Sequence, residues 1–285
     1  MNRIVKKRVL APNVNEYVID APLVVKNARP GQFVILRVDE EGERIPFTIC
    51  DMDKAAGTVT LLVQEVGYST AKLAKLVVGD GVADFVGPLG KPTDLSAHKN
   101  IVLVGGGIGT AVIYPQAKAL FEAGRPAAVI LGARNRELLM YTDEFKRAAK
   151  SLYIATDDGS AGQKGFVTDL LKELLEADRQ RAKNGIDCVM AVGPMPMMRA
   201  VANLTKEYGV HTVVSMNPIM VDGTGMCGGC RLSVGGKTVY ACVDGPEFDA
   251  HEVDWADAIA RLSLYKETEQ AHRCRLTDET AGGQK

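Results

Sequence analysis

The sequence predicts a β + α/β protein: an N-terminal antiparallel β-barrel, a doubly wound parallel α/β domain and a C-terminal segment rich in Gly and Cys. Short runs of β-branched residues alternate with turn residues over 1–97, which is typical of a small barrel. Continuous apolar runs alternate with helical stretches over 98–215, which is typical of a parallel sheet. Gly and Cys gather in 216–250, and residues 251–285 are expected to form a C-terminal helix and tail.

The composition narrows the class of protein. The 285 residues are 46% hydrophobic and 24% charged, so a sizeable core is expected, and the net charge of −1 gives no electrostatic case for binding nucleic acid or an anionic membrane. No N-terminal run resembles a signal peptide, and no run approaches the roughly 18 apolar residues of a spanning helix. Six Cys in a chain of this length do not indicate a disulfide scaffold. The expected location is the cytoplasm.

Six runs in the first unit are expected to be strands because they are rich in Val, Ile, Leu, Phe and Thr and are bounded by turn residues such as Pro30-Gly31 and Gly57. One helix is expected, over Thr70–Leu76. The six runs are Arg3–Leu10, Val14–Ile19, Phe33–Val38, Ile45–Cys50, Thr58–Gln64 and Val82–Val86.

The second unit alternates apolar strands with helices. The first strand ends in a glycine loop, and a helical stretch then runs to Ala123. The expected strands are Ile101–Val104, Ala127–Leu131, Leu152–Ala155, Cys188–Val192 and Thr212–Ser215, and the later helices are Phe166–Leu175 and Pro196–Tyr208.

The third unit is expected to contain a hairpin of Arg231–Val234 and Thr238–Cys242, which turns at Gly235-Gly236. A helix is expected from about Trp255, and 277–285 is expected to be a disordered tail.

Three loops follow apolar strands at one edge of the predicted sheet. In the run Gly105-Gly-Gly-Ile-Gly109-Thr110, glycine lets the backbone approach a phosphate, and the N-terminus of the following helix stabilises the anion. Its spacing differs from G-x-G-x-x-G, and a tight turn without a ligand is the alternative. Thr156-Asp-Asp-Gly-Ser160 and Gly193-Pro-Met-Pro-Met-Met198 are the other two loops. Three loops at this edge predict a nucleotide site.

Two motifs in the barrel half fit a second cofactor. In Arg44-Ile-Pro-Phe-Thr48, the Arg can pair with a pyrophosphate and the Thr can hydrogen-bond a flavin ring nitrogen. The alternative is an exposed strand Arg and a Thr with high β propensity. Gly67-Tyr-Ser-Thr70 can begin a helix as an ordinary N-cap or serve as a second phosphate cradle.

The run Asp222-Gly-Thr-Gly-Met-Cys227-Gly-Gly-Cys230, followed by Cys242, has the order of a thiolate cage for a metal. A plant-type [2Fe–2S] site reads C-x4-C-x2-C with a distant fourth Cys, and here Asp222 holds the first position. A carboxylate donates less electron density than a thiolate and can protonate, so it should alter the cluster potential and could couple that potential to pH. A zinc site with three Cys and a disulfide between Cys227 and Cys230 are the alternatives.

The ordered set of motifs resembles the ferredoxin–NADP reductase superfamily over about residues 1 to 255. It comprises the motifs above together with Gly87-Pro88-Leu89-Gly90. The nearest likenesses are to the electron-transfer subunit of dihydroorotate dehydrogenase B and, closer still, to the small subunit of the electron-bifurcating NADH-dependent ferredoxin:NADP oxidoreductase. The resemblance implies an FAD-binding barrel, a nicotinamide domain and a C-terminal [2Fe–2S] loop.

The resemblance also implies a role for each matching residue. Thr48 would lie near N5 of the flavin and tune it by hydrogen bonding, and it is the residue assigned to catalysis. The other positions are Arg44, Pro46 and Phe47 in the flavin motif, Val63 and Gln64 along the flavin, and Gly67, Ser69 and Thr70 at its phosphate. Gly106, Gly107, Gly109 and Thr110 match the nicotinamide-nucleotide loop, with Asp157, Asp158, Gly193, Pro194 and Met195 beside it. Asp222, Cys227, Cys230 and Cys242 would hold the cluster.

The implied function is exchange of hydride between NAD(H) and FAD, with single electrons passing through the cluster to a larger FAD/[4Fe–4S] subunit of the glutamate-synthase small-subunit type. Ferredoxin and NADP(H) would be reached through that complex. Asp222 resembles the bifurcating subunit, whereas a Cys there would favour the alternative, delivery of electrons to the FMN partner of dihydroorotate dehydrogenase. A distant alternative is an NAD-sensing module with zinc and no flavin. Arg134 or Arg136 could hold a 2′-phosphate, as in NADP binders, or could simply face solvent, and the resemblance implies NAD(H).

Overall fold

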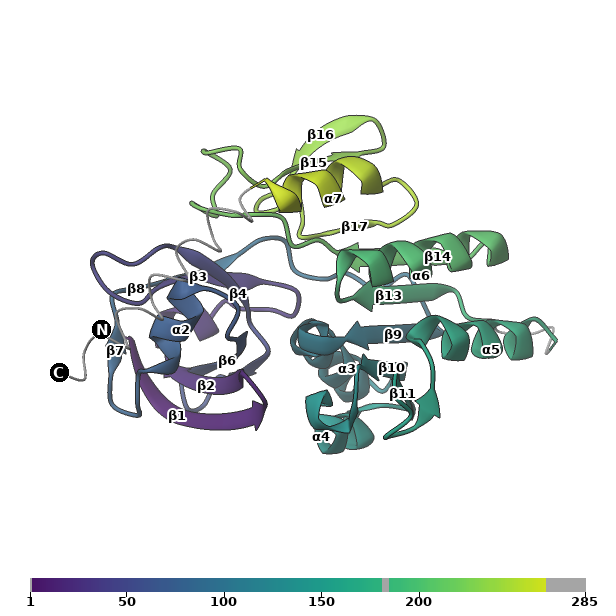
Figure 1. Cartoon of the computed structure of the whole chain (residues 1–285), viewed down its shortest axis with the longest axis horizontal. Coiled ribbons are helices and arrows are strands. Elements are labelled where there is room, and N and C mark those ends of the chain that lie inside the picture. The colour runs from purple at the N-terminus through teal and green to yellow at the C-terminus, as the bar shows by residue number, and fades with distance from the viewer. Residues whose placement is uncertain (1, 181–184, 265–285) are drawn as a thin grey trace.

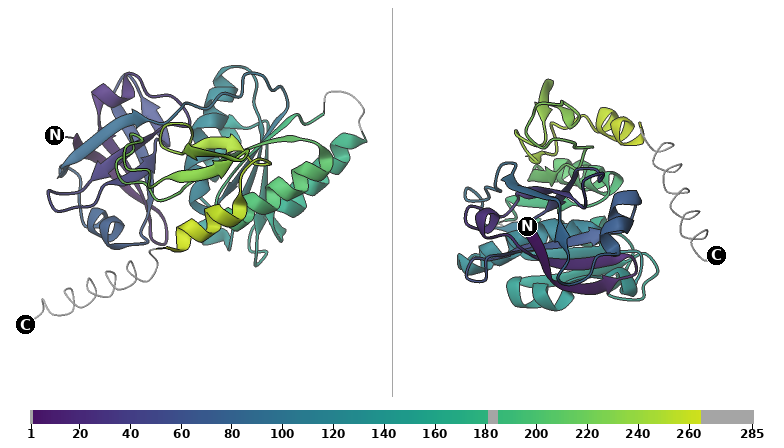
Figure 2. Two further views of the ribbon diagram at one scale, coloured as in Figure 1. Left: turned by 90° about the horizontal axis from the view of Figure 1, so that it is seen from above. Right: turned by 90° about the vertical axis from the view of Figure 1, so that its left-hand side faces the viewer.

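The structure, a computed structural model, describes residues 2–180 and 185–264. It consists of a β-barrel, an α/β domain beside it and a smaller hairpin segment that lies over the junction between the two (Figures 1 and 2). Among the described residues, no helix is both long enough and apolar enough to cross a membrane. The expected tail at 277–285 lies outside the described residues.

The barrel consists of two antiparallel sheets. One has the order β5-β6-β2-β1-β7 and the other has the order β4-β3-β8. The strands are β1 (Asn2–Ala11), β2 (Val14–Asp20), β3 (Phe33–Arg37), β4 (Ile45–Thr48), β5 (Asp51–Asp53), β6 (Thr58–Gln64), β7 (Gly81–Val82) and β8 (Asp84–Leu89), and the helices are α1 (Pro22–Val25) and α2 (Tyr68–Ala74). Alternate strand residues such as Tyr17, Ile19, Val34 and Leu36 fill one apolar core.

The α/β domain contains a seven-stranded sheet with the order β12-β11-β10-β9-β13-β14-β17. All pairs are parallel except β14 with β17. The elements are β9 (Ile101–Gly106), η1 (Gly107–Gly109), α3 (Thr110–Glu122), β10 (Ala128–Ala133), η2 (Arg136–Leu138), α4 (Thr142–Ala148), β11 (Ser151–Thr156), β12 (Gln163–Lys164), α5 (Val167–Arg179), β13 (Cys188–Val192), α6 (Met195–Tyr208) and β14 (His211–Ser215).

Two buried clusters cover the two faces of this sheet. Side chains of α3 and α4 belong to one cluster, and side chains of α5 and α6 belong to the other. Every residue of β9 and β13 is buried, as expected for parallel strands covered on both faces. In α5 the buried residues Val167, Leu170, Leu171 and Leu175 follow helical spacing. The predicted doubly wound domain is confirmed.

The hairpin segment completes the fold with β15 (Arg231–Val234), β16 (Lys237–Tyr240), β17 (Glu247–Asp249) and α7 (Trp255–Ser263). The hairpin and the C-terminal helix agree with the prediction. Because β17 pairs with β14, the segment adds a strand to the sheet of the α/β domain.

The sequence prediction missed several elements. It expected only one helix in the barrel half, where the structure has α1 and α2, and it did not include α4. The unpredicted elements are α1, β5, η2, α4, β12 and β17. Each is seven residues or shorter, so its periodicity carries little signal, and tertiary contacts decide its conformation.

Glu247 on β17 joins the hairpin segment to the connection that leaves the barrel. Its Oε1 accepts a hydrogen bond from Thr93 Oγ1 at 2.5 Å, and the main-chain N–H of Lys91 donates to the carbonyl of Gly245. Burial of the Glu247 carboxyl raises its pKa to about 7, against a smaller lowering by the Thr93 hydroxyl. The carboxyl is therefore still largely protonated in the folded chain at pH values where it is ionised in the unfolded chain.

This raised pKa predicts a stability that depends on pH. Between about pH 4.5 and pH 7 the folded chain binds more protons than the unfolded chain, so stability falls as the pH rises through this window and then levels off. Glu247→Gln should remove this loss, which is on the order of 1 kcal/mol because part of the residue remains open to solvent. Thermal unfolding midpoints between pH 5 and pH 8 test this, with Glu252→Gln as a nearby exposed control. Equal pH profiles for wild type and Glu247→Gln would contradict the assignment.

Candidate functional site

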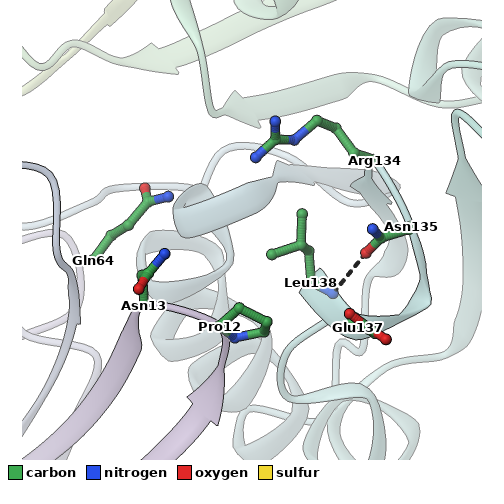
Figure 3. Close-up of a pocket in the computed structure, with 7 residues that line it drawn as sticks. All are labelled: Pro12, Asn13, Gln64, Arg134, Asn135, Glu137 and Leu138. Atoms are coloured by element: carbon green, nitrogen blue, oxygen red, sulfur yellow. Dashed lines mark hydrogen bonds between the residues drawn. The ribbon is translucent and has the colours of Figure 1, made fainter.

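A cavity of about 340 Å³ lies between the barrel and the α/β domain (Figure 3). Its barrel side is the turn between β1 and β2, with Gln64 at the end of β6, and its other side is the loop after β10. The lining residues are Pro12, Asn13, Gln64, Arg134, Asn135, Glu137 and Leu138. The cavity thus borders the carboxyl edge of the parallel sheet, which is where open α/β sheets bind ligands.

The glycines of the loop after β9 have different structural roles. A Cβ on Gly109 would collide with the carbonyl of Val192, and a Cβ on Gly106 would collide with Met197 Sδ. These two glycines are therefore needed for close packing of the loop. Gly107 differs, because its φ is 54° and a Cβ there would meet nothing within 4 Å. Gly107 is the position in this loop where a nucleotide phosphate could approach the backbone.

The two neighbouring loops are organised by their own side chains. Asp158 Oδ1 accepts hydrogen bonds from the N–H and the hydroxyl of Ser160, at 2.9 and 2.6 Å, and the hydroxyl bond is the main cause of the lowered pKa of Asp158. Asp157 is exposed beside it. Arg136 donates to the Ser160 carbonyl at 2.8 and 2.9 Å, so it holds this loop, whereas Arg134 extends along the cavity (Figure 3).

The third loop places most of its side chains in the core. Met195 is only 4% exposed and packs in the buried cluster, so its side chain is not available as a cofactor wall. Pro194 precedes α6, and Gly193 lies against Met197 and the Gly106 carbonyl. Met197 is the residue that sequence reasoning missed, because nothing in a run of three Met residues shows which one covers the glycine loop.

The flavin motif splits between the two faces of β4. Phe47 packs against the core of the barrel and is only partly buried, so its contact with the cofactor stays a prediction. Pro46 and Thr48 lie on the opposite face because side chains alternate along a strand. Arg44 is 3.7 Å from Asp84, which pairs more closely with Arg37 at 2.6 Å, so the Arg44 guanidinium is only loosely paired and could turn to a diphosphate.

On β6, Val63 is 1% exposed and can offer a ligand only its backbone, whereas Gln64 reaches the cavity.

The start of α2 already holds an oxyanion. Ser69 Oγ donates to Glu43 Oε2 at 2.6 Å, and a Cβ on Gly67 would meet nothing within 4 Å. Thr70 Oγ1 accepts from the N–H groups of Val66 and Gly67, both at 3.0 Å, so this hydroxyl serves as the helix cap. The Ser69 hydroxyl therefore already binds an anionic oxygen, and the open space at Gly67 is compatible with the predicted flavin phosphate. Glu43 was not predicted, since a Glu before the Arg motif carries no signal by itself.

The predicted metal ligands converge only in part. Cys230 and Cys242 are buried with their Sγ atoms 3.2 Å apart, and burial followed by the neighbouring Cys230 raises the pKa of Cys242 to about 12. Cys227 is exposed, and its Sγ accepts from the N–H of Gly229 at 3.4 Å. Within the described ranges, no three His, Cys, Asp or Glu side chains form a metal-binding group.

Asp222 organises the loop that carries these Cys residues. Its carboxylate accepts hydrogen bonds from the N–H groups of Thr224, Met226 and Cys227 at 3.1, 2.9 and 3.0 Å. Desolvation opposes ionisation, but these donors outweigh it and lower the pKa of Asp222 to about 2. Gly223, Gly225 and Gly228 have positive φ angles and curl the chain around this carboxylate. Three thiols on a curled loop and an adjoining hairpin are a donor set that fits an iron–sulfur cluster.

Two family models match the chain at these sites. The oxidoreductase NAD-binding domain matches residues 103–203, and the iron–sulfur cluster binding domain of dihydroorotate dehydrogenase B matches residues 217–254. The predicted nicotinamide domain and iron–sulfur segment are confirmed.

Similar whole proteins cover nearly the entire chain. A protein of Thermotoga maritima called the dihydroorotate dehydrogenase B (NAD(+)) electron transfer subunit homolog is 48% identical over 99% of this chain and 97% of its own length. The electron transfer subunit of Fusobacterium nucleatum dihydroorotate dehydrogenase B is 35% identical over 81% of this chain and 89% of its own. A solved structure of an NADH-dependent reduced ferredoxin-NADP oxidoreductase, described as giving insights into flavin-based electron bifurcation, has a sequence 45% identical to this chain. It superposes with a TM-score of 0.89 over 97% of this chain and 98% of that one.

The convergence of Cys230 and Cys242 predicts which thiols hold iron. Cys242→Ser should lose at least half of the bound iron and sulfide, because a hydroxyl is a poor ligand for an iron–sulfur cluster. Cys188 is a buried thiol in β13, so Cys188→Ser is the matched control, and this variant should keep its iron and sulfide. Iron and sulfide analysis of anaerobically purified variants checks this. Full iron content in Cys242→Ser would refute the assignment.

Proposed function

This chain belongs to the family of dihydroorotate dehydrogenase B electron-transfer subunits and their homologues, and we propose that it carries electrons between NAD(H) and a larger partner through FAD and a [2Fe–2S] cluster. It is an oxidoreductase subunit with an NAD-binding domain and an iron–sulfur domain. The proposed complex is an electron-bifurcating NADH-dependent ferredoxin:NADP oxidoreductase.

One observation carries the proposal: a single buried cluster joins the flavin strand to the cysteine loop. Phe33 on β3 pairs with Thr48 on β4 and belongs to the same buried cluster as Cys230 and Cys242. A Cβ on Gly223 would lie 2.8 Å from Ile35, also on β3, so the cysteine loop packs directly against this strand. Close packing of this kind favours a short path from a barrel-bound flavin to a cluster on the loop.

When bound, FAD would supply the conversion between a hydride pair and single electrons. The residues of the chain hold and orient the ligands. Thr48 offers a hydroxyl to a flavin ring nitrogen, Arg44 offers a guanidinium to the diphosphate, and Ser69 donates to a phosphate oxygen in place of Glu43. Gly107 admits the nicotinamide dinucleotide to the N-terminal end of α3. No side-chain acid or base is required.

The surface around the cysteine loop fits a protein partner. Val221, Met226 and Val243 are 53, 88 and 39% exposed beside Cys227. Exposed apolar side chains next to an electron-carrying site favour docking of another subunit. The proposed partner is an FAD/[4Fe–4S] subunit of the glutamate-synthase small-subunit type, through which ferredoxin and NADP(H) exchange electrons.

A second candidate is delivery of electrons to the FMN subunit of a dihydroorotate dehydrogenase. The iron–sulfur family model and the Fusobacterium relative favour it, because both are described by that enzyme. The substrates of the purified native complex distinguish the two candidates. A dihydroorotate dehydrogenase would oxidise dihydroorotate with NAD⁺, whereas the bifurcating oxidoreductase would couple NADH, NADPH and ferredoxin.

The proposal predicts the content of protein purified without oxygen. Flavin analysis should find one FAD, and metal analysis should find about two irons and two sulfides per chain. Addition of NADH should bleach the flavin and produce the electron paramagnetic resonance signal of a reduced [2Fe–2S] cluster, and NADPH serves as the parallel test of nucleotide preference. Purified protein that contains flavin but no iron would be a simple reductase without the proposed cluster. Zinc without flavin would refute the proposal.

A further inference from the structure

A buried group of polar side chains joins the barrel to the α/β domain. Tyr141, immediately before α4, donates its hydroxyl to Glu16 Oε2 on β2 at 2.6 Å. Tyr141 is 7% exposed and Glu16 is 5% exposed. Arg8 on β1 donates to both oxygens of Glu16 at 3.2 and 2.8 Å, and it approaches Glu144 of α4 at 3.9 Å. We call Arg8, Glu16, Tyr141 and Glu144 the junction network.

The backbone of Tyr141 shows that its side chain is held in place. Its φ and ψ are 57° and 23°, in the left-handed region that bulky residues rarely adopt. Such a conformation persists where surrounding contacts enforce it. The ring packs edge-on against Tyr114 of α3, with centroids 4.9 Å apart, and the buried Cys50 thiol of the barrel half lies beside its hydroxyl.

The junction network connects the two walls of the interdomain cavity. Arg8 and Glu16 lie on the strands that lead into and out of the turn carrying Pro12 and Asn13. Tyr141 lies three residues after Leu138, the last lining residue of the opposite wall (Figure 3). The Tyr141–Glu16 hydrogen bond, with the longer Arg8–Glu144 approach beside it, therefore connects the element behind one wall to the element behind the other.

We propose that the Tyr141–Glu16 hydrogen bond fixes the α/β domain against the barrel so that a nicotinamide ring and a flavin ring, held on different domains, meet at reacting distance. Tyr141 and Glu16 are positioning residues, since they act through the placement of the two domains. This inference rests on the proposed function. Its physical basis is that bound reactants must lie within about 3–3.5 Å, and that a misplacement of about 1 Å can cost a hundredfold in rate.

The test compares Tyr141→Phe with Tyr114→Phe in the full, cofactor-loaded chain. Both variants remove one hydroxyl from the same aromatic cluster, and within the described part of the chain the Tyr114 hydroxyl has no hydrogen bond to lose. Stopped-flow reduction of the bound flavin by NADH gives the limiting rate and the half-saturating NADH concentration. A second readout needs no cofactor: hydrogen–deuterium exchange of the peptide over 138–146.

The expected result is a limiting rate about tenfold lower in Tyr141→Phe, with half-saturation by NADH, flavin content and iron content unchanged. NADH deuterated at C4 should give a larger isotope effect in this variant, since a misplaced donor makes hydride transfer slower. Exchange over 138–146 should rise with and without cofactors, and Glu16→Leu, which removes the acceptor of this hydrogen bond, should behave like Tyr141→Phe. Tyr114→Phe should match wild type in every measurement.

Unchanged rate and exchange in Tyr141→Phe, or equal losses in Tyr114→Phe, would overturn the positioning role. The proposed function fails separately, if NADH does not reduce the flavin of the wild-type chain at all. In that case, exchange in the chain without cofactors still decides whether the contact fixes the two domains.

Discussion

The buried contact between the barrel and the α/β domain is the constraint on which the rest of the structure depends. Neither domain offers all of the proposed site: Thr48, Gln64 and Ser69 come from the barrel, whereas Gly107 comes from the loop after β9. The two domains share side chains within single buried clusters, and Cys50 and Leu62 of the barrel half pack with α3 and α4. Because interiors are close-packed and deform little, such shared clusters fix one relative position of the two halves.

The cysteine segment is tied to both halves by the same kind of packing. Strand β17 extends the sheet of the α/β domain, and Glu247 bonds to Thr93 in the connection that leaves the barrel. Leu232 of the hairpin lies in the cluster that also contains Phe33 of the barrel and Val104 of the sheet. A small hairpin alone would be marginally stable, so its position depends on these contacts. The three parts therefore pack together, which would hold the proposed cofactor sites on different parts at fixed separations.

The sequence was sufficient for the architecture because long apolar runs carry strong periodicity. The five strands predicted in the second unit and the glycine loop lie where they were expected, and the family models match the predicted NAD-binding and iron–sulfur domains. The sequence was insufficient where the role of a residue depends on neighbours that are distant in the sequence. Gly106 and Gly107 are identical in the sequence, yet one makes room for Met197 and the other is open. Tyr141 could not be predicted as a junction residue, since its partner Glu16 is 125 residues away. Phe47 and Thr48 were both predicted to contact the flavin, but their side chains lie on opposite faces of β4 because side chains alternate along a strand.

Asp222 organises the loop that is proposed to hold the metal cluster. Its two oxygens gather three backbone N–H groups, and the last of these belongs to Cys227. Ionised acceptors make stronger hydrogen bonds than neutral ones, and a thiol accepts only weakly. A Cys at position 222 would complete a four-thiolate set, but its sulfur would hold these donors less strongly than the carboxylate oxygens do. The carboxylate is thus built into the fold of this loop, and any cluster that the loop holds must form around a chain whose curvature Asp222 has already set.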